Sequence, residues 1–176
     1  MIWKFTDNKS RDSIEQQFDW ARNMNEVPQD KLYHAEGNVA VHTWKVIEEL
    51  QQLPAYSDLG GQDKEILWTA ALLHDVEKRS ATVVESDGRI TARGHARKGE
   101  YTVRTLLYRD LPTPFAIREK IASLVRFHGL PLWLMEKTDP VRKIAEVAFR
   151  LDTSQLRMLA EADIRGRICQ DREELL

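Results

Sequence analysis

The sequence predicts an all-α domain, and three observations favour that class. Apolar residues recur every three or four positions over most of the chain, which is the spacing of one helix face. Glycine and proline, eight and six in 176 residues, interrupt this pattern at only a few points. Only residues 81–91 carry β-branched residues on both sides of an Asp-Gly turn signal, so we expect one short β-hairpin there.

Three helices are expected in the first half of the chain. Residues 10–24 place Ile14 and Phe18 on one stripe. Residues 38–53 form an apolar face that a histidine interrupts, and this face consists of Val39, His42, Val46 and Leu50. Asp63 is expected to be the N-cap of a third helix that runs to His74.

The second half of the chain predicts five more helices. Residues 95–108 place Tyr101, Thr105 and Tyr108 on a shared face. Three prolines suit the starts of the helices that follow, namely Pro114, Pro131 and Pro140. The last helix is expected from about residue 153, and no internal domain boundary is predicted.

Composition limits the class of protein further. A chain of 176 residues with 42% apolar and 31% charged residues is expected to form one domain with a packed core. The net charge of −2 excludes a globally basic protein that coats nucleic acid, although it allows a local basic patch. The single cysteine, Cys169, excludes an internal disulfide framework and a cysteine-rich zinc module. Since no signal-peptide pattern and no run of about 20 apolar residues is present, we expect a cytoplasmic protein that does not enter a membrane.

Polar side chains stand at the ends of several apolar stripes, where core residues would be expected. They are His42, His74, His128 and Asp163, and Asp75 follows His74 directly. Any one such histidine is more often a hydrogen-bonded core residue, and a lone carboxylate is more often a cap or an ion-pair partner. Several imidazoles and two carboxylates that face one core need a shared reason, because a buried unpaired carboxylate is costly. A divalent cation supplies one, since imidazole and carboxylate are its natural ligands.

The spacing of the candidates supports a site assembled from separate helices. Apart from the adjacent pair His74 and Asp75, each candidate lies on a different predicted helix. Helical bundles build metal sites in this way, from side chains on facing helices. Because adjacent residues diverge by about 100° around a helix, we expect the His74–Asp75 pair to lie near a helix end.

These residues resemble the HD superfamily of metal-dependent phosphohydrolases. The matching segments are VHTW around His42, AALLHDVEK around His74 and Asp75, RGHARKGEYTVRTLL around His95, SLVRFHGLP around His128 and EADIRGR around Asp163. The two-letter HD motif alone is weak, whereas the ordered series on separate helices is specific. HD domains are all-α helical bundles, and the resemblance covers about residues 34–167. We therefore expect residues 1–176 to form one HD domain.

Two segments indicate which members of the HD superfamily the chain resembles most. YHAEGNVAVHTW and EADIRGR are similar to the HD domain of bacterial CCA-adding tRNA nucleotidyltransferases. They are more similar to the HD module of RNA end-healing proteins, where it precedes a P-loop polynucleotide kinase. This resemblance implies removal of 2′,3′-cyclic phosphate and of 2′- or 3′-terminal phosphate from RNA 3′ ends. The chain has no GxxxxGK[ST] motif and stops abruptly at residues 173–176, so we expect a domain of a longer protein with a C-terminal kinase, or one that associates with such a kinase.

The resemblance also implies the cofactors, which are one or two divalent transition metal ions. One ion would bind His42, His74, Asp75 and Asp163, and a second would bind His95 and His128 with Asp75 as the bridge. His74, Asp75 and Lys78 would be catalytic, and a hydroxide generated at the metal would attack phosphorus. Mixed histidine and aspartate ligation suits Mn, Fe, Co, Ni or Zn and does not distinguish among them.

The substrate phosphate needs cations beside the metal ligands. Lys78 follows His74 by about one helical turn, and residues 89–104 hold five basic residues and one acidic residue. The residues expected to bind the phosphate are His34, Lys78, Arg97, Lys98 and Arg165. The alternatives are a surface position for His34, a solvated helix face for the basic cluster and a structural ion pair for Arg165. Glu77 stands where many relatives have glycine, and we expect it to face solvent.

Four functions are compatible with these observations. The first is a phosphoesterase that acts on RNA ends, and the second is a phosphohydrolase of free nucleotides. The third is a non-catalytic metal-binding regulatory module, which the complete set of six ligand positions disfavours. The fourth is a helical domain whose core histidines are simply hydrogen-bonded.

Overall fold

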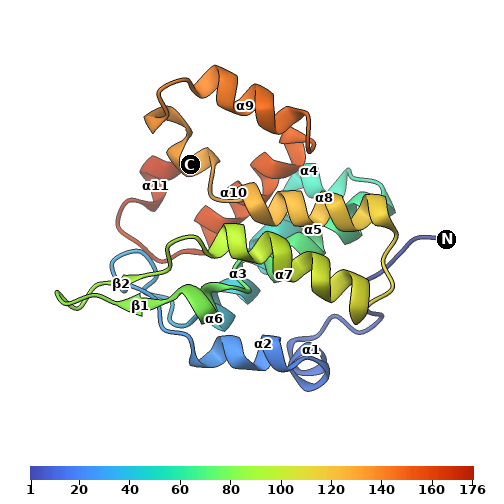
Figure 1. The fold of residues 1–176 in the computed structure, drawn as a ribbon, viewed down its shortest axis with the longest axis horizontal. Coiled ribbons are helices and arrows are strands. Elements are labelled where there is room, and N and C mark those ends of the chain that lie inside the picture. The colour runs from blue at the N-terminus through green and yellow to red at the C-terminus, as the bar shows by residue number, and fades with distance from the viewer.

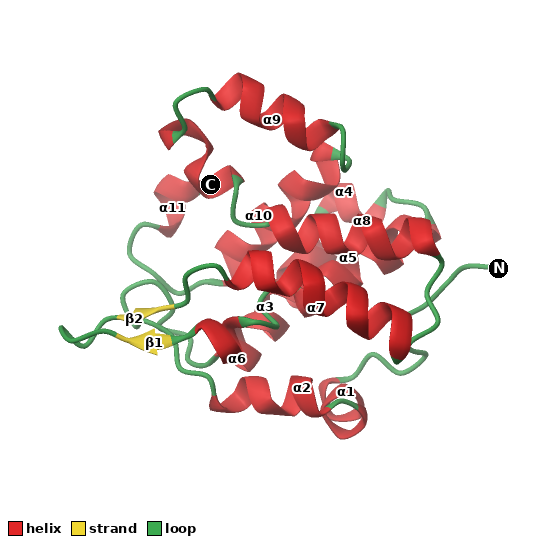
Figure 2. Ribbon diagram, in the orientation of Figure 1, coloured by secondary structure: helices red, strands yellow, loops and turns green.

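The computed structural model describes residues 1–176 and consists of helices with one small antiparallel sheet (Figures 1 and 2). The longer helices are α3 (Val39–Gln52), α5 (Gly61–Leu73), α7 (His95–Arg109), α8 (Phe115–Phe127) and α10 (Thr153–Gly166). The shorter elements are α1 (Arg11–Gln17), α2 (Asp19–Asn23), η1 (Met24–Glu26), α4 (Pro54–Ser57), α6 (Lys78–Ala81), η2 (Pro131–Glu136), α9 (Pro140–Ala148) and α11 (Arg172–Leu175). In the hairpin, β1 (Val83–Val84) pairs with β2 (Ile90–Thr91). The all-α class and the hairpin are both confirmed, and no helix combines the length and apolar character that a membrane crossing requires.

The five longer helices enclose the hydrophobic core. Helix α3 packs on α5 and α10, while α8 packs on α5 and α7. Helices α1 and α2 lie on one side of this bundle, α9 lies on the opposite side, and the hairpin projects from a third edge (Figure 1). The buried face predicted for α3 is confirmed, because Val39, His42, Val46 and Leu50 are all inaccessible to solvent.

Glycine at position 166 lets α10 approach α3 closely. A Cβ atom on Gly166 would lie 2.9 Å from Val46 Cγ2 and 3.0 Å from the Val46 backbone nitrogen. Real Cβ atoms do not come this close, so a side chain here would push the two helices apart. The contact matters for the site, because α3 and α10 each carry one of the predicted metal ligands.

Two predicted helix starts differ from the structure. The helix expected over residues 10–24 breaks at Phe18, whose extended backbone separates α1 from α2. Helix α5 begins at Gly61, so Asp63 lies in its first turn, where the helix dipole favours a carboxylate, and is not the N-cap. The three prolines fall where they were expected, because Pro114 is the N-cap of α8, and Pro131 and Pro140 open η2 and α9.

The face predicted for α7 is wrong. Tyr101 and Tyr108 are exposed, whereas Gly99, Val103 and Leu107 are buried and face the rest of the bundle. Gly99 permits this face of α7 to pack against α8, since a Cβ atom at position 99 would lie only 3.1 Å from a side-chain methyl of α8. Close contact between the two helices therefore decides which face of α7 is buried.

Candidate metal centre

The predicted ligands meet where the ends of several helices converge. His42 lies in the first turn of α3, and Asp163 lies in the last turn of α10. His74 and His128 directly follow the last residues of α5 and α8, while His95 is the first residue of α7. Because α5 ends at residue 73, the chain turns at this point and the adjacent His74 and Asp75 side chains both face the same centre. All six ligands except the partly exposed His95 are buried.

Asp75 stands between two groups of histidines. Its Oδ2 atom lies 3.2 Å from His74 Nε2 and 3.9 Å from His42 Nε2. Its Oδ1 atom lies 3.2 Å from His95 Nε2 and 3.8 Å from His128 Nε2. The ligand atoms therefore form two triads that share this carboxylate, and within each triad they lie within 4.8 Å of one another.

Asp163 adds a second carboxylate to the first triad. Its Oδ1 atom lies 3.0 Å from His42 Nε2. Arg167, one helical turn later, forms a bidentate pair with Asp163, with Nη2 2.8 Å from Oδ2 and Nε 3.2 Å from Oδ1. Burial alone would raise the pKa of Asp163, but Arg167 and His42 hold that pKa well below 3.8. The side chain is therefore ionised at neutral pH and can offer carboxylate oxygen to a metal ion.

Backbone carbonyls fix the orientation of three imidazole rings. The Nδ1 atoms of His74, His95 and His128 lie 2.7, 2.7 and 2.8 Å from the carbonyl oxygens of Ala71, Ala92 and Val125. A carbonyl only accepts a hydrogen bond, so each Nδ1 carries the proton and donates it. The other ring nitrogen, Nε2, then presents a lone pair to the centre, as a metal ligand must.

The cluster passes a test for metal binding that does not depend on sequence similarity. His74 Nε2 and Asp75 Oδ1 are buried and have no hydrogen-bond partner. His95 Nε2 and His128 Nε2 lie 3.3 Å apart, with both Nδ1 atoms already protonated. Unpartnered buried polar atoms are costly, and a domain with satisfied core histidines would not contain them. The residues fit one or two divalent ions, for which imidazole nitrogen and carboxylate oxygen are suitable ligands.

Burial and neighbouring charges set the protonation of the shared site. Burial alone would raise the pKa of Asp75, but His74 and Lys78 hold that pKa well below 3.8. Burial lowers the pKa of His128 to about 3, and the neighbouring His74 adds to this effect. An ionised carboxylate and a neutral imidazole are the forms that bind a metal ion.

Glu36 is a buried contributor that the sequence analysis missed. Its Oε1 atom lies 2.8 Å from His42 Nδ1 and 2.8 Å from His34 Nδ1. Its Oε2 atom accepts a hydrogen bond of 2.8 Å from the backbone nitrogen of Ile168, and the side chain is inaccessible to solvent. Glu36 therefore faces the rear nitrogen of His42 and leaves His42 Nε2 toward the centre. The sequence signal available for Glu36 was its place in the chain, two residues after His34 and six before His42.

A cavity of about 430 Å³ opens from solvent onto the metal centre. Predicted ligands form one part of its wall, namely Asp75, His95, His128 and Asp163. Basic side chains form another, namely Lys78, Arg89 and Arg167. Apolar side chains include Tyr33, Ile90, Leu132, Trp133 and Leu175. The cavity thus joins metal ligands, cations and an apolar wall in one space.

Two of the residues predicted to bind phosphate line this cavity. Lys78 Nζ lies 2.8 Å from Asp75 Oδ2, although α5 ends before Lys78 and a turn carries the chain to it. His34 also lines the cavity, and the centroid of its ring lies 4.6 Å from that of His42. Burial lowers the pKa of His34 to about 4, so its imidazole is neutral at pH 7.

Arg97, Lys98 and Arg165 do not line the cavity. Lys98 is exposed, and its Nζ donates to the carbonyl oxygen of Ser80 at 3.3 Å. Arg165 forms a surface ion pair with Glu161 through two hydrogen bonds of 3.1 and 2.9 Å. The alternative of a structural ion pair for Arg165 is thus the one that the geometry matches.

The expectation that Glu77 faces solvent is wrong. Only 6% of Glu77 is exposed, because its carboxylate accepts a hydrogen bond of 2.8 Å from the Thr102 hydroxyl on α7. It also accepts hydrogen bonds from Arg79 and Ser80 on α6. Glu77 therefore ties α6 to α7.

Comparison with known proteins agrees with this geometry. The profile of the HD domain family matches residues 39–161, which is more than half of the chain. The chain belongs to the HD domain family. The chain is 29% identical over 152 residues to a protein named "Multifunctional CCA protein" from Nitrosococcus oceani, a match that covers 80% of this chain and 33% of that protein. The chain thus spans about a third of the length of that relative. The family and the cluster of histidines and aspartates together indicate a metal-dependent phosphohydrolase.

Proposed function

We propose that this HD domain removes 2′,3′-cyclic phosphate and 2′- or 3′-terminal phosphate from RNA ends. The observation that carries the proposal is the position of Asp75 between two histidine triads, at the bottom of a cavity that also holds three cations. Two metal ions held by these triads would stabilise both the attacking and the leaving oxygen of a phosphoryl transfer. The resemblance of YHAEGNVAVHTW and EADIRGR to RNA end-healing modules supports RNA ends as the substrate class.

The metal ligands and Lys78 have different roles in the proposed reaction. Divalent ions bound at this centre would lower the pKa of water to about 7 and neutralise charge on the phosphate. The first ion would be held by His42, His74, Asp75 and Asp163, and the second by Asp75, His95 and His128. Lys78 would donate from Nζ to a phosphate oxygen beside Asp75, since it is already 2.8 Å from that carboxylate.

Arg167 and Arg89 complete the surroundings of the phosphate. Arg167 is held in place by its bidentate pair with Asp163, and it lines the cavity, so its guanidinium faces the incoming phosphate. Arg89 comes from the turn between the hairpin strands and contributes a cation to the same wall. These two arginines take the role that the sequence pattern assigned to Arg97, Lys98 and Arg165.

The proposed reaction consists of two hydrolyses. In the first, water adds to the phosphorus of the cyclic diester, one phosphorus–ribose oxygen bond breaks, and that ribose oxygen takes up a proton. In the second, another water adds to the phosphorus of the resulting monoester, the remaining phosphorus–ribose oxygen bond breaks, that oxygen takes up a proton, and inorganic phosphate leaves. A P-loop polynucleotide kinase, fused or associated, would then act on the opposite RNA end.

The test uses an RNA oligonucleotide that ends in 2′,3′-cyclic phosphate. The purified protein is incubated separately with Mn, Co, Ni and Zn, and phosphate release is followed beside that from a 5′-mononucleotide. The expected result is conversion of the RNA end by the wild type, little conversion of the mononucleotide, and no conversion by the matched variant Asp75→Asn.

Each other outcome contradicts the proposal in a distinct way. Conversion of the mononucleotide alone would assign the protein to the phosphohydrolases of free nucleotides. Stoichiometric metal binding without conversion of either substrate would identify a regulatory metal module. Absence of bound metal in the wild type would reject the metal centre itself.

A further inference from the structure

The cavity contains a wall that phosphate hydrolysis does not use. Metal ligands and cations account for one part of the lining, and an apolar part remains, with Tyr33, Ile90, Leu132, Trp133 and Leu175. A volume of about 430 Å³ lies within the range of about 300 to 1,000 Å³ that is typical of small-molecule sites. The cavity therefore has room for a group that is attached to the phosphate.

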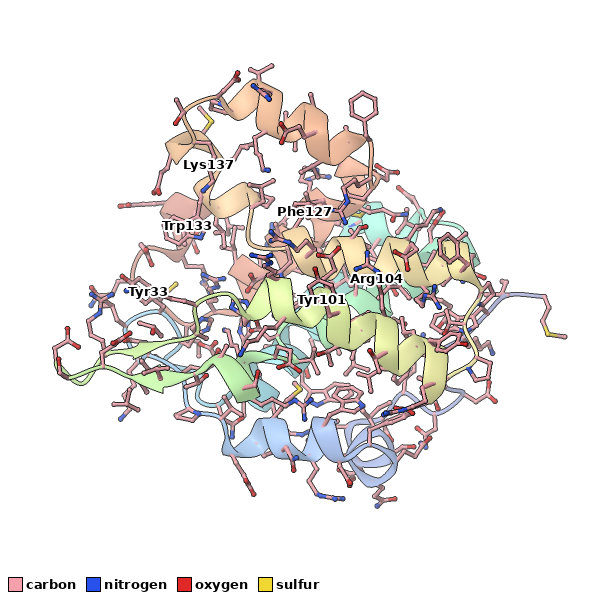
Figure 3. The ribbon with its side chains drawn as sticks, in the orientation of Figure 1. Tyr33, Tyr101, Arg104, Phe127, Trp133 and Lys137 are labelled. Atoms are coloured by element: carbon pink, nitrogen blue, oxygen red, sulfur yellow. The ribbon has the colours of Figure 1, made fainter.

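Trp133 is the largest side chain of this wall. It lies on η2, five residues after His128, and both side chains line the cavity. No residue of η2 is buried, and 52% of Trp133 is exposed, which shows that the indole is not part of the core. Figure 3 shows Trp133 on the same side of the molecule as Tyr33, which comes from the loop before α3 and also lines the cavity.

A buried amide without a partner points independently to a ligand. Gln29 lines the cavity and is only 7% exposed. Its Oε1 atom accepts a hydrogen bond of 2.6 Å from Lys78 Nζ, and an ammonium only donates, so this atom must be the amide oxygen. The remaining atom, Nε2, is buried and has no hydrogen-bond partner. Because Lys78 Nζ also lies 2.8 Å from Asp75 Oδ2, the Gln29 amide directly contacts the ammonium that is expected to bind the phosphate.

We propose that Trp133 and Gln29 form a subsite for the nucleoside of the terminal nucleotide. Trp133 stacks on the base, and Gln29 Nε2 donates a hydrogen bond to an oxygen of the sugar-phosphate. The inference rests on the proposed function and names what the cavity selects, which is a phosphoester that carries a nucleobase. Every base offers a π face, so stacking on an indole selects nucleotides over other phosphoesters without selecting one base.

The test compares two substrates that differ only in the base. They are adenosine 2′,3′-cyclic phosphate and 1-O-methylribose 2′,3′-cyclic phosphate, each with Mn²⁺. We expect the wild type to have a kcat/KM roughly ten- to a hundredfold higher for the adenosine compound, which is the usual effect of one stacked base. Trp133→Ala should bring this ratio close to one through KM, and Trp133→Phe should retain most of it because an aromatic ring remains. The matched control Phe149→Ala removes an exposed aromatic ring outside the cavity and should leave the ratio unchanged.

Gln29→Glu tests the polar half of the subsite. This variant keeps an oxygen for Lys78 and loses the free N–H donor of the wild type. It should lower kcat/KM for both substrates by a similar factor, on the order of tenfold, and leave the ratio between them unchanged. A wild type that treats the two substrates equally, or a ratio that survives in Trp133→Ala, would overturn the proposal.

A binding measurement separates this inference from the proposed function. If the wild type converts neither substrate, the proposed function fails, and calorimetric titration with adenosine 3′-monophosphate in the presence of Mn²⁺ takes the place of turnover. Binding that Trp133→Ala weakens at least about tenfold would support the subsite without catalysis. Equal binding by both proteins, or no binding by either, would reject the subsite.

Discussion

The floor of the cavity and its rim are built in different ways. The floor is the metal centre, whose six predicted ligands are His42, His74, Asp75, His95, His128 and Asp163, and five packed helices bring them together. Asp75, His95, His128 and Asp163 line the cavity directly, while His42 and His74 lie behind them. The rim comes from the loop before α3, the hairpin, η2 and the C-terminal segment, and it includes Gln29, Tyr33, Arg89, Trp133 and Arg167. A floor fixed by the hydrophobic core holds reacting groups in position, whereas a rim made largely of loops and short elements can differ among proteins of one family. Under the proposed function, the core would determine the chemistry and the rim would determine the substrate.

The largest expected effect comes from the carboxylate that both triads share. Asp75→Asn should abolish binding of both metal ions and lower kcat/KM at least about a thousandfold, because a bound metal contributes several kcal/mol to the transition state. His95→Gln should remove only the second triad and leave about one bound ion per chain. Metal content measured by mass spectrometry, together with phosphate release, checks both variants. Equal metal loss in the two variants would contradict the proposal that Asp75 serves both triads.

Substitution of Glu36 should have an intermediate effect on metal affinity, because Glu36 contacts a predicted metal ligand and not the metal itself. Glu36→Ala leaves His42 Nδ1 without the carboxylate that lies 2.8 Å away, and we expect metal affinity to fall about ten- to a hundredfold. Glu36→Gln keeps an oxygen at this place and should restore part of the affinity. Competition with a chelator measures the change, while thermal unfolding of the metal-free proteins reports any general loss of stability. If Glu36→Ala retained the wild-type metal affinity, the contact with His42 would have no role in metal binding. Glu36 would then serve only to hold the C-terminal segment through the backbone nitrogen of Ile168.

The buried histidines should make the metal-free protein sensitive to mild acid. The pKa of His128 is about 3 and that of His34 about 4 in the folded chain, against 6.5 when unfolded. Between pH 6.5 and 4.5 the unfolded chain therefore binds protons that the folded chain does not, and the free energy of unfolding falls as the pH falls, by up to about 1.4 kcal/mol per pH unit for each histidine. Burial alone would lower the pKa of His74, but Asp75 and Asp163 raise it, so His74 does not add to this loss of stability.

Urea unfolding of chelator-treated protein at several pH values measures this slope. His34→Gln removes one of the two groups and should reduce the slope by about half. Stability that rises as the pH falls from 6.5 to 5 would contradict the assignment of neutral buried imidazoles.

The smallest expected effect is that of replacing Arg165, and the neighbouring Arg167 provides the contrast. Arg165 forms an exposed ion pair with Glu161 one turn earlier, and Arg165→Ala should change stability by no more than about 0.5 kcal/mol and leave kcat/KM unchanged. Arg167 forms a buried pair with Asp163, and its removal should cost about 3 to 5 kcal/mol, because the carboxylate is left without its partner. Chemical unfolding and phosphate release on both variants provide the measurement. Similar effects of the two substitutions would place Arg165 at the cavity as well.

Much of the floor was predictable because its signal is local in the sequence. Helical periodicity places His42, His74, His128 and Asp163 on apolar faces, and the cost of burying such groups without partners already indicates a metal ion. The hairpin was predictable for a similar reason, since its Asp-Gly turn and β-branched residues are neighbours in the chain. In both cases, the physical preference that forms the element acts over a few residues.

The tertiary structure alone decided the rest. Which face of α7 is buried depended on the close contact that Gly99 allows, and the burial of Glu77 depended on a partner 25 residues away. Glu36 and Gln29 lie in a loop with no periodicity. The spacing marks Glu36 as a neighbour of two histidines in the chain, but only the fold shows that Glu36 contacts His42 and that Gln29 contacts Lys78. The sequence by itself determined which buried polar groups need a hydrogen bond, an ion pair or a metal ion, because burial energies depend on residue type. The fold decided which partners satisfy them and which groups are left for a ligand, because those outcomes depend on distances between segments that only the folded chain brings together.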